Sequence, residues 1–544
     1  MRNGKGLMIL GVSLLAALIC ACTGPGEKAA DSKVFRYNEA ADITSLDPAF
    51  ARDQANIWAV NQLFNGLVQL NDKLEVIPCI ASRWEISDEG RAYTFHLRSD
   101  AFFHDDPCFA GGEGRRVTAG DFVYSFRRIL DPATASPGAW VFGWLAGSEP
   151  FSAANDSTLV IRLKKTFPPF LGILTTQYCS VVPEEAVDWY GAEFRRHPVG
   201  TGPFRFAMWK EGVKLVLRKN PDYFEVENGT RLPYLDAVAI TFLADRQSAF
   251  LEFVKGRLDL ISGIDPAYKD ELLTRQGALN PKYAGRVSLL RTPYLNTEYL
   301  AVMVDPSSEL MKGNPLRLSK VREAVNLSFD RRKMIAYLRN NIGVPGYFGI
   351  IPPGIPGSDT AVRYGGYDPG RAAELLAESG FPGGRGLPAI TLYSTPDYLD
   401  ICKYIQFQSA ALGIDLRIEV TPPAAMKEMK AQAKLPFFRA SWIADYPDAE
   451  SYLSLFVTEN FCPGGPNYTH FSDPEYDRLY RRAMAETDDS VRYSIYREME
   501  RRMMGQCPVI VLYYDEVLRF TRKSVEGLGI NGMNLLSLKR VRKN

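Results

Sequence analysis

Cysteine and histidine are the side chains whose spacing in this sequence is most informative about catalysis and metal binding. Six cysteines lie beyond residue 22, and the whole chain has only four histidines. None of the six cysteines forms a Cys-x-x-Cys pair and the histidines are scattered, so we expect no structural zinc site. The sequence also lacks the Gly-x-Ser-x-Gly, P-loop and His-Glu-x-x-His motifs. We therefore expect no catalytic residue, no cofactor and no metal, with a hydrolase kept as an alternative.

The amino-terminal segment has the pattern of a signal peptide. Arg2 and Lys5 precede an apolar run over 7–21, which is shorter than the roughly 20 residues that span a bilayer. The run ends in a motif that resembles a bacterial lipobox, with a small residue directly before a cysteine and an aliphatic residue three before it: Ile19-Cys20-Ala21-Cys22. We expect a signal peptide over 1–21, lipidation of Cys22 and a polar tether over 22–31. An ordinary signal peptide, cut after Ala21 without lipidation, is the alternative.

The composition of the chain is that of a globular protein. Hydrophobic residues make up 46% and charged residues 23%, and the formal net charge is +1. This balance provides no basic surface for nucleic acid. After the amino-terminal run, no stretch approaches a membrane-spanning length without charges. We expect a monomer, and the length of 544 residues suggests roughly three to four domain-sized units.

An exported chain can form disulfides. We predict a bridge between Cys79 and Cys108, because part of the segment between them has the pattern of a β-hairpin that would bring the two cysteines together. Free, buried thiols are an equally open alternative, since connectivity does not follow from sequence.

Strand and helix patterns alternate irregularly along the chain. Strands are expected at 34–37, 84–87, 92–98 and 509–513. Helices are expected from residue 56 to 64, from a Thr118 cap, from the Asp368-Pro369 and Asp473-Pro474 starts, and through 491–503. This mixture predicts an α/β protein with several sheets.

Several segments match, in order, the peptide-binding family of extracytoplasmic receptors for ABC importers, which includes oligopeptide- and dipeptide-binding proteins. The chain resembles this family from about residue 34 to its end. The segments are Ser45-Leu46-Asp47-Pro48, Leu63-Phe64-Asn65-Gly66-Leu67, Ala81-Ser82-Arg83-Trp84, Thr118-Ala119-Gly120-Asp121, Gly200-Thr201-Gly202-Pro203-Phe204, Val321-Arg322-Glu323-Ala324 and Ser441-Trp442-Ile443-Ala444-Asp445-Tyr446.

The resemblance implies a two-lobed, periplasmic binding protein-like α/β fold with three domains. One lobe would comprise 32–71, 200–290 and 510–544, an inserted domain 72–199, and the other lobe 291–509. A peptide ligand would lie between the lobes and add as a strand to exposed backbone. The partners would be a membrane-embedded ABC permease with its ATPase, and the location would be extracytoplasmic. A receptor of the same fold for a nickel chelate, heme, a sugar or a pheromone is an alternative, and so is a structural lipoprotein or chaperone.

Asp445 is the strongest candidate for ligand binding that the resemblance gives. The matching aspartate of the oligopeptide-binding protein holds the α-amino group of the ligand, and a carboxylate suits an ammonium, which has three donors and no acceptor. The alternative is that Asp445 caps a turn before Pro447.

The remaining candidates also come from the resemblance. Ser441 and Ile443 would present backbone to the ligand, and Trp442 would line a pocket or lie in the core. On the other lobe, Arg52, Asp53 and Gln54 align with the family's ligand-facing strand, and Tyr294 matches an aromatic residue of the cleft. Arg439 lies where the family has an arginine available to the ligand's carboxylate, although a solvated or ion-paired arginine is the alternative.

The sequence also departs from the family pattern at three positions. A disulfide of the oligopeptide receptor is lost, because its two cysteines are replaced by Ile443 and Asn296. A lysine that pairs with ligand carboxylates in that receptor aligns with Asn326, which brings no charge. The carboxylate of a bound ligand is therefore expected near Arg439.

Overall fold

The computed structural model describes residues 33–544. The expected signal peptide, the lipidation at Cys22 and the tether lie outside these residues. In the part of the chain that is described, no helix is long and apolar enough to cross a membrane.

One large mixed sheet runs through both lobes of the molecule. Within residues 33–544 it has eleven strands, in the order β17-β16-β18-β14-β19-β13-β1-β12-β9-β8, with β15 paired to β19. The strands on the first-lobe side are β1 (Val34–Asn38), β8 (Phe204–Lys210), β9 (Lys214–Lys219), β12 (Ala237–Thr241) and β13 (Leu260–Ser262). Those on the second-lobe side are β15 (Val344–Pro345), β16 (Ile390–Ser394), β17 (Leu416–Val420) and β18 (Phe437–Ile443).

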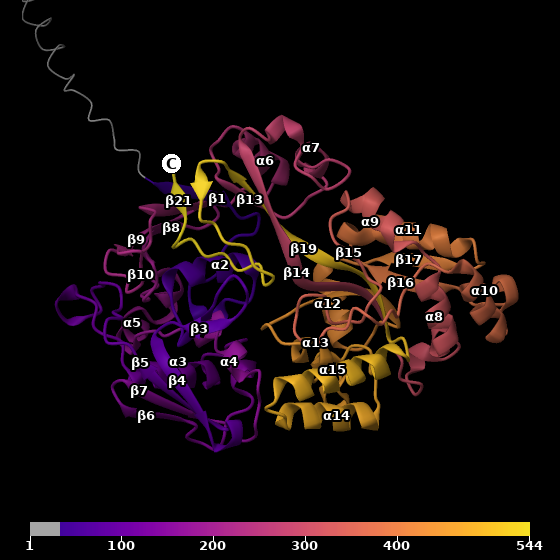
Figure 1. Cartoon of the computed structure of the whole chain (residues 1–544), viewed down its shortest axis with the longest axis horizontal. Coiled ribbons are helices and arrows are strands. Elements are labelled where there is room, and N and C mark those ends of the chain that lie inside the picture. The colour runs from indigo at the N-terminus through magenta and orange to yellow at the C-terminus, as the bar shows by residue number, and fades with distance from the viewer. Residues whose placement is uncertain (1–32) are drawn as a thin grey trace, which may run out of the picture.

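Two long strands connect the lobes. β14 (Val287–Val302) and β19 (Val509–Arg522) are antiparallel partners along most of their length, and Figure 1 shows both crossing from the first lobe to the second. Their register shifts between Pro293 and Thr297, and such an irregularity bends and twists a strand pair. The bend lies where the two lobes meet, so it shapes the space between them.

The inserted domain is a separate antiparallel sheet with helices packed on it. Its strand order is β4 (Ala81–Ser87), β5 (Ala92–Leu97), β7 (Thr158–Arg162) and β6 (Phe151–Asn155). Helix α3 (Ala119–Leu130) begins with the capping box of Thr118 and Asp121, which satisfies two backbone donors of the first turn. Helices α4 (Phe170–Ile173) and α5 (Glu184–Tyr190) complete this domain, which lies below the first lobe in Figure 1.

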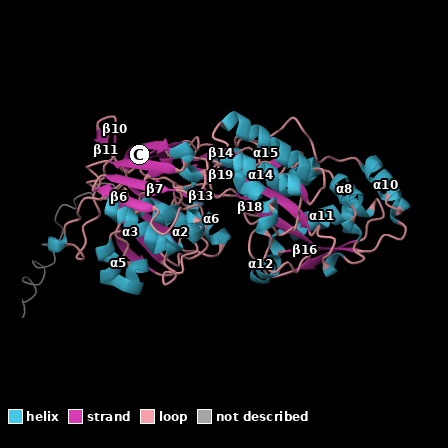
Figure 2. Cartoon of the chain, turned by 90° about the horizontal axis from the view of Figure 1, so that it is seen from below, coloured by secondary structure: helices cyan, strands magenta, loops and turns pink. Residues whose placement is uncertain are grey.

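Most helices belong to the second lobe, where they cover the sheet (Figure 2). They are α8 (Ser319–Leu327), α9 (Arg331–Arg339), α10 (Pro369–Glu378), α11 (Leu399–Ala410), α12 (Pro423–Ala431), α13 (Glu450–Leu453), α14 (Pro474–Ala485) and α15 (Asp489–Met504). The first lobe has α2 (Gln54–Leu63), α6 (Arg246–Val254) and α7 (Lys269–Leu272). Short ribbons are formed by β2 (Val68–Leu70) with β3 (Val76–Pro78), β10 (Val226–Glu227) with β11 (Thr230–Arg231), and β20 (Val525–Glu526) with β21 (Arg542–Lys543). The expectation of an α/β protein with several sheets is confirmed.

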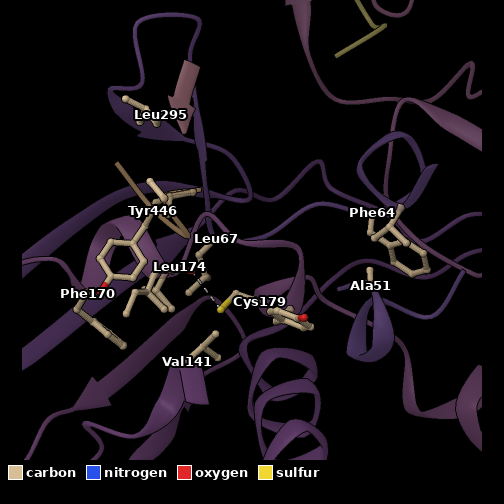
Figure 3. Packing of buried hydrophobic residues seen from close by; sticks show 14 of the residues in the cluster. Ala51, Phe64, Leu67, Val141, Phe170, Leu174, Cys179, Leu295 and Tyr446 are labelled. Atoms are coloured by element: carbon tan, nitrogen blue, oxygen red, sulfur yellow. Dashed lines mark hydrogen bonds between the residues drawn. The ribbon is translucent and has the colours of Figure 1, made fainter. Parts of the chain in front are cut away.

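The inserted domain and the second lobe share an apolar contact. Tyr446, which follows β18, lies beside Phe170 and Leu174 of the inserted domain (Figure 3). Its ring also stacks with that of Trp140 at a centroid distance of 6.3 Å. A side chain at Gly172 would lie 3.6 Å from the Tyr446 Cβ, so the two surfaces approach closely next to residue 445.

The expected Cys79–Cys108 disulfide is wrong. All six cysteines within residues 33–544 are free thiols. Cys79 is buried beside the hairpin β4–β5, where its backbone N–H donates to Leu67. Cys108 lies in the following loop, held by Asp106. The hairpin ends at Leu97, well before Cys108, so its strand pairing does not bring the two cysteines together.

Candidate ligand-binding site

Asp445 follows the last residues of β18, and its backbone is fixed from two sides. The Ala444 N–H donates to the Leu295 carbonyl at 2.9 Å, and the Asp445 N–H donates to the Ser451 hydroxyl at 3.1 Å. Within residues 33–544, no hydrogen bond or ion pair to the Asp445 carboxylate is found. The side chain is reached by water, yet protein surrounds it closely, and this desolvation raises its pKa to about 6. A nearby cation would stabilise the ionised form of this carboxylate, which has no such partner within the described residues.

The inserted domain and the first lobe face Asp445 from across the cleft. Burial raises the pKa of Tyr178 to about 12, and the negative charges of Asp445 and Asp53 add to this while Arg52 opposes it. Two contacts place the neighbouring segments: the Gln177 side-chain amide donates to the carbonyl of Ala51, next to Arg52, at 2.6 Å, and Tyr446, next to Asp445, stacks with Trp140 of the inserted domain.

The strand before Asp445 has an open edge. On one side β18 pairs with β14 from Asn296↔Ile443 to Val302↔Phe437. On the other side β16 pairs with β18 only at Tyr393↔Phe438, so residues 440–443 have no second partner strand among residues 33–544. The Ile443 side chain is 46% exposed. Backbone at such an edge can accept the strand of another chain.

Trp442 is partly buried, in agreement with both expected roles. Its indole N–H lies 3.3 Å from the same Ser451 hydroxyl that binds the Asp445 backbone. Ser451 thereby couples the position of the tryptophan ring to that of the aspartate. Asn296 and Ile443, the positions of the missing disulfide, are direct partners across β14 and β18.

The expected strand at residues 52–54 is not formed. Asp53 is instead the N-cap of α2, and its carboxylate accepts the N–H of Asn56 at 3.2 Å. Aspartate is a preferred N-cap because it satisfies an otherwise free N–H of the first helical turn, and this local preference overrides the alignment to a strand. Arg52 precedes the cap, and Gln54 is the first residue of the helix.

A cavity of about 550 Å³ opens between the lobes, large enough for a small ligand or one peptide side chain. Asp53, Gln54 and Tyr294 line it, whereas Arg52, Arg439 and Asp445 do not. Tyr294 lies at the irregularity of β14, opposite Asp515 and Glu516 of β19.

Sequence reasoning missed Arg339, Tyr398 and Asp515 of this cavity. The sequence carries only a weak signal for these three residues, because each lies in a segment whose polar residues could equally well be exposed to solvent.

Arg439 is ion-paired inside the second lobe. Its guanidinium donates to the Glu298 carboxylate on the neighbouring strand β14. The guanidinium carbon lies 3.2 Å from the centre of the Tyr398 ring. The two side chains are only 12% and 3% exposed. The geometry therefore matches the ion-paired alternative, and Glu298 was missed, although a glutamate within the apolar run of β14 was a signal.

Two further residues define the surroundings of Arg439. Lys430 on α12 has its pKa lowered to about 8 by burial and by the nearby Arg439 charge, so a second cation lies close to the first. Asn326 is buried and bonded to Arg331 and to the Tyr364 carbonyl. The amide is therefore held by contacts within the second lobe.

Metal binding gains no support from the side-chain arrangement. Among residues 33–544 there is no group of three or more His, Cys, Asp or Glu side chains placed to hold a metal ion.

Comparison with known proteins identifies the family. The model for bacterial extracellular solute-binding proteins, family 5, matches residues 75–461. The dipeptide-binding protein DppE of Bacillus subtilis is 26% identical, with full coverage of both chains. The periplasmic oligopeptide-binding protein OppA of Salmonella typhimurium is 25% identical, covering 97% of this chain and 96% of that protein.

The fold has a counterpart among solved structures. The periplasmic binding protein DppA of Helicobacter pylori, solved in complex with the peptide STSA, superimposes with a TM-score of 0.77 at 24% identity, covering 94% of this chain and 98% of that one. The two-lobed binding-protein fold with an extra inserted domain is thereby confirmed. These relatives are substrate-binding proteins rather than enzymes, and the match of the family model over most of the chain shows that this protein belongs to the bacterial extracellular solute-binding proteins of family 5.

Proposed function

We propose that this protein is the lipid-anchored receptor of an ABC importer and that it captures a peptide between its two lobes. The family membership and the peptide-binding relatives support a peptide solute and a transporter partner. The observation that carries the proposal is the open edge of β18, which ends beside the unpaired carboxylate of Asp445. An extended peptide added to this edge would place its amino terminus within reach of that carboxylate.

Asp445 would fix the ligand by its charged amine. A hydrogen bond between charged groups contributes about 1.5–3 kcal/mol. The desolvation that raises the Asp445 pKa to about 6 would be relieved by an ammonium, because a nearby opposite charge stabilises the ionised acid. Backbone contacts along β18 would be independent of ligand sequence, while side chains would enter the cavity between the lobes.

The test compares a short peptide with its N-acetylated form by calorimetry. Wild type should bind the free-amine peptide more tightly, and Asp445→Asn should weaken it by about 10-fold or more while changing the acetylated peptide little. Asp415→Asn, an exposed aspartate of the same lobe that is paired with Arg417, is the matched control. An equal loss for both peptides would show that Asp445 does not hold the amine.

The anchoring and the domain division complete the proposal. Lipidation of Cys22 would hold the receptor at the membrane, since about 0.8 kcal/mol is gained for each methylene group buried in lipid. The lobes would follow the bounds 32–71, 200–290 and 510–544 for the first, 72–199 for the inserted domain and 291–509 for the second. Cys22→Ser should release the mature protein from membranes, and an unmodified mature amino terminus would refute the anchor.

A further inference from the structure

Two buried polar groups without partners point into the cavity between the lobes. Tyr37 is 1% exposed, and its hydroxyl has no hydrogen-bond partner among residues 33–544. One carboxylate oxygen of Glu39 is likewise buried without a partner. Both residues line the cavity. Unpaired buried polar groups are rare because each costs free energy, so the two that line this cavity are candidates to bind a polar group of a ligand.

The backbone places Tyr37 and Glu39 side by side. Tyr37 belongs to β1, and Glu39 follows that strand by one residue, with its N–H bonded to the Thr241 carbonyl at 2.9 Å. Residues two apart in an extended chain point to the same face. β1 runs parallel to both β12 and β13, and the cavity lies beyond the carboxyl ends of parallel strands, where α/β proteins bind ligands.

The charges around the cavity are unequal. Its charged lining residues are the acids Glu39, Asp42, Asp53, Asp515 and Glu516 and the bases Arg246 and Arg339. Asp515 is paired with Arg339 and Glu516 with Arg291, so the acids without an ion pair among the described residues are Glu39, Asp42 and Asp53.

Both arginines are already engaged. Arg339 is ion-paired with Asp515, and Arg246 lies 3.2 Å from Asp265 outside the cavity. Arg246 still acts on Glu39 and lowers its pKa, but neither arginine forms an ion pair with Glu39, which has none among the described residues. A ligand carboxylate would be repelled at this end of the cavity, whereas a cation would be attracted.

The apolar part of the lining suits a long basic side chain. The aromatic lining residues are Tyr37, Trp58, Tyr268, Tyr294 and Tyr398. Lysine and arginine bury their methylene stems along apolar surface and keep the charged end among polar groups, and aromatic rings attract such charges. The cavity volume of about 550 Å³ accommodates one such side chain with water.

The position of Asp53 links this end of the cavity to the proposed amine site. The negative charge of Asp53 acts on Glu39 and also on Tyr178, which in turn lies near Asp445. Asp53 lines the same cavity as Glu39, so a peptide bound between the lobes can extend a side chain towards Glu39. Burial raises the pKa of Glu39 to about 7, with Arg246 opposing and Asp53 adding to the shift. A cation beside it would lower this pKa again.

We propose that Tyr37 and Glu39 form a subsite for a positively charged group of the ligand, such as the side-chain end of a lysine or arginine residue in a peptide. The proposal rests on the proposed function, and it names the class of peptide that the receptor prefers. Glu39 would accept hydrogen bonds from the cation, and the Tyr37 hydroxyl would complete the polar end of the subsite.

The experiment is calorimetric binding of short peptides with free amino termini, in pairs that differ only by lysine or norleucine at one position. We expect lysine to be preferred by about 10-fold or more at one position. Glu39→Gln should remove this preference while it changes the affinity for the norleucine peptide less than about 2-fold. Glu374→Gln, an exposed glutamate on α10, should keep the preference.

A second measurement uses only the wild type, so it does not depend on the folding of a variant. At pH 7 the lysine peptide should release protons on binding, seen as a dependence of the binding enthalpy on the buffer, and the norleucine peptide should release fewer. Peptides that bind with no lysine preference at any position would overturn the subsite and leave the receptor function intact. Failure of every peptide to bind, with the chain folded by circular dichroism, would overturn both.

Discussion

Arg439 on β18 and Glu298 on β14 form an ion pair in the interior of the second lobe, with the ring of Tyr398 over the guanidinium. The side-chain amide of Asn296 donates to the same glutamate at 3.0 Å. Removing one partner of a buried pair leaves the other charge without compensation, which is more costly than replacing both.

Arg439→Met should therefore reduce the free energy of unfolding by about 3–5 kcal/mol. Adding Glu298→Gln to Arg439→Met should recover part of the lost free energy of unfolding, because it removes the buried negative charge that the first substitution leaves without a partner. Urea denaturation of the two single variants and the double variant measures this coupling. Strictly additive losses would show that the two side chains do not stabilise each other.

The same pair bears on the carboxyl end of the ligand. Arg439 is only 12% exposed and already donates to Glu298, so we expect a ligand carboxylate to meet Lys430, the other cation of this region. C-terminal amidation should weaken binding most at one peptide length, and this penalty should disappear in Lys430→Met and persist in Arg439→Met, as measured by calorimetry on a length series. The reverse outcome would show that the carboxylate competes with Glu298 for Arg439.

Binding of the amine should depend on pH through Asp445. Its pKa is raised to about 6 in the unliganded protein, so the carboxylate is largely ionised at pH 7 and largely protonated at pH 5. Affinity for a free-amine peptide should fall by about 10-fold between these values. An acetylated peptide should show a smaller change, and Asp445→Asn should flatten the profile of the free-amine peptide. An unchanged profile in the variant would contradict the assignment.

Two buried glutamates should make the unliganded protein more stable in mild acid. Burial raises the pKa of Glu500 to about 8 and that of Glu450 to about 7. In this range the folded state binds protons that the unfolded state releases, so the free energy of unfolding falls as pH rises. The melting temperature should rise as the pH is lowered from 9 to 6. Glu500→Gln should reduce this slope, whereas Glu374→Gln on the surface should keep it.

Gly202 should tolerate no side chain. A Cβ at this position would lie 2.4 Å from the backbone carbon of Leu63, and the Gly202 N–H donates to the Leu63 carbonyl at 2.8 Å. Gly202→Ala should lower the melting temperature by several degrees because backbone must move. Gly285→Ala, where nothing lies within 4 Å of the added carbon, is the control. Equal effects of the two substitutions would show that this approach of backbone to backbone is unimportant.

Local signals in the sequence predicted local structure well. The capping residues Thr118 and Asp473 mark the starts of α3 and α14 as expected, and the hairpin after Trp84 is present as β4 and β5. The candidates at Asp445 and in β18 lie together because they are neighbours in the sequence.

Features that depend on distant pairing were not predictable. The partner of Arg439 lies 141 residues earlier in the chain, and no local pattern links the two. The strand expected at Asp53 failed because a helix cap was the stronger local preference. The disulfide failed because a hairpin between two cysteines does not set the path of the chain beyond it. Tyr37 and Glu39 were missed since a strand end with one glutamate is ordinary in sequence.

The placement of β19 also determines when the protein can fold. This strand lies between β13 and β14, although both precede it in the chain. Leu260 of β13, for example, pairs with Thr521 of β19. A chain still being synthesised therefore has two incomplete half-sheets with facing open edges, and native pairings of such long separation form slowly. Translation must pass residue 522 before either half can close. Completion of the large sheet is thus a late event, because it needs nearly the whole chain.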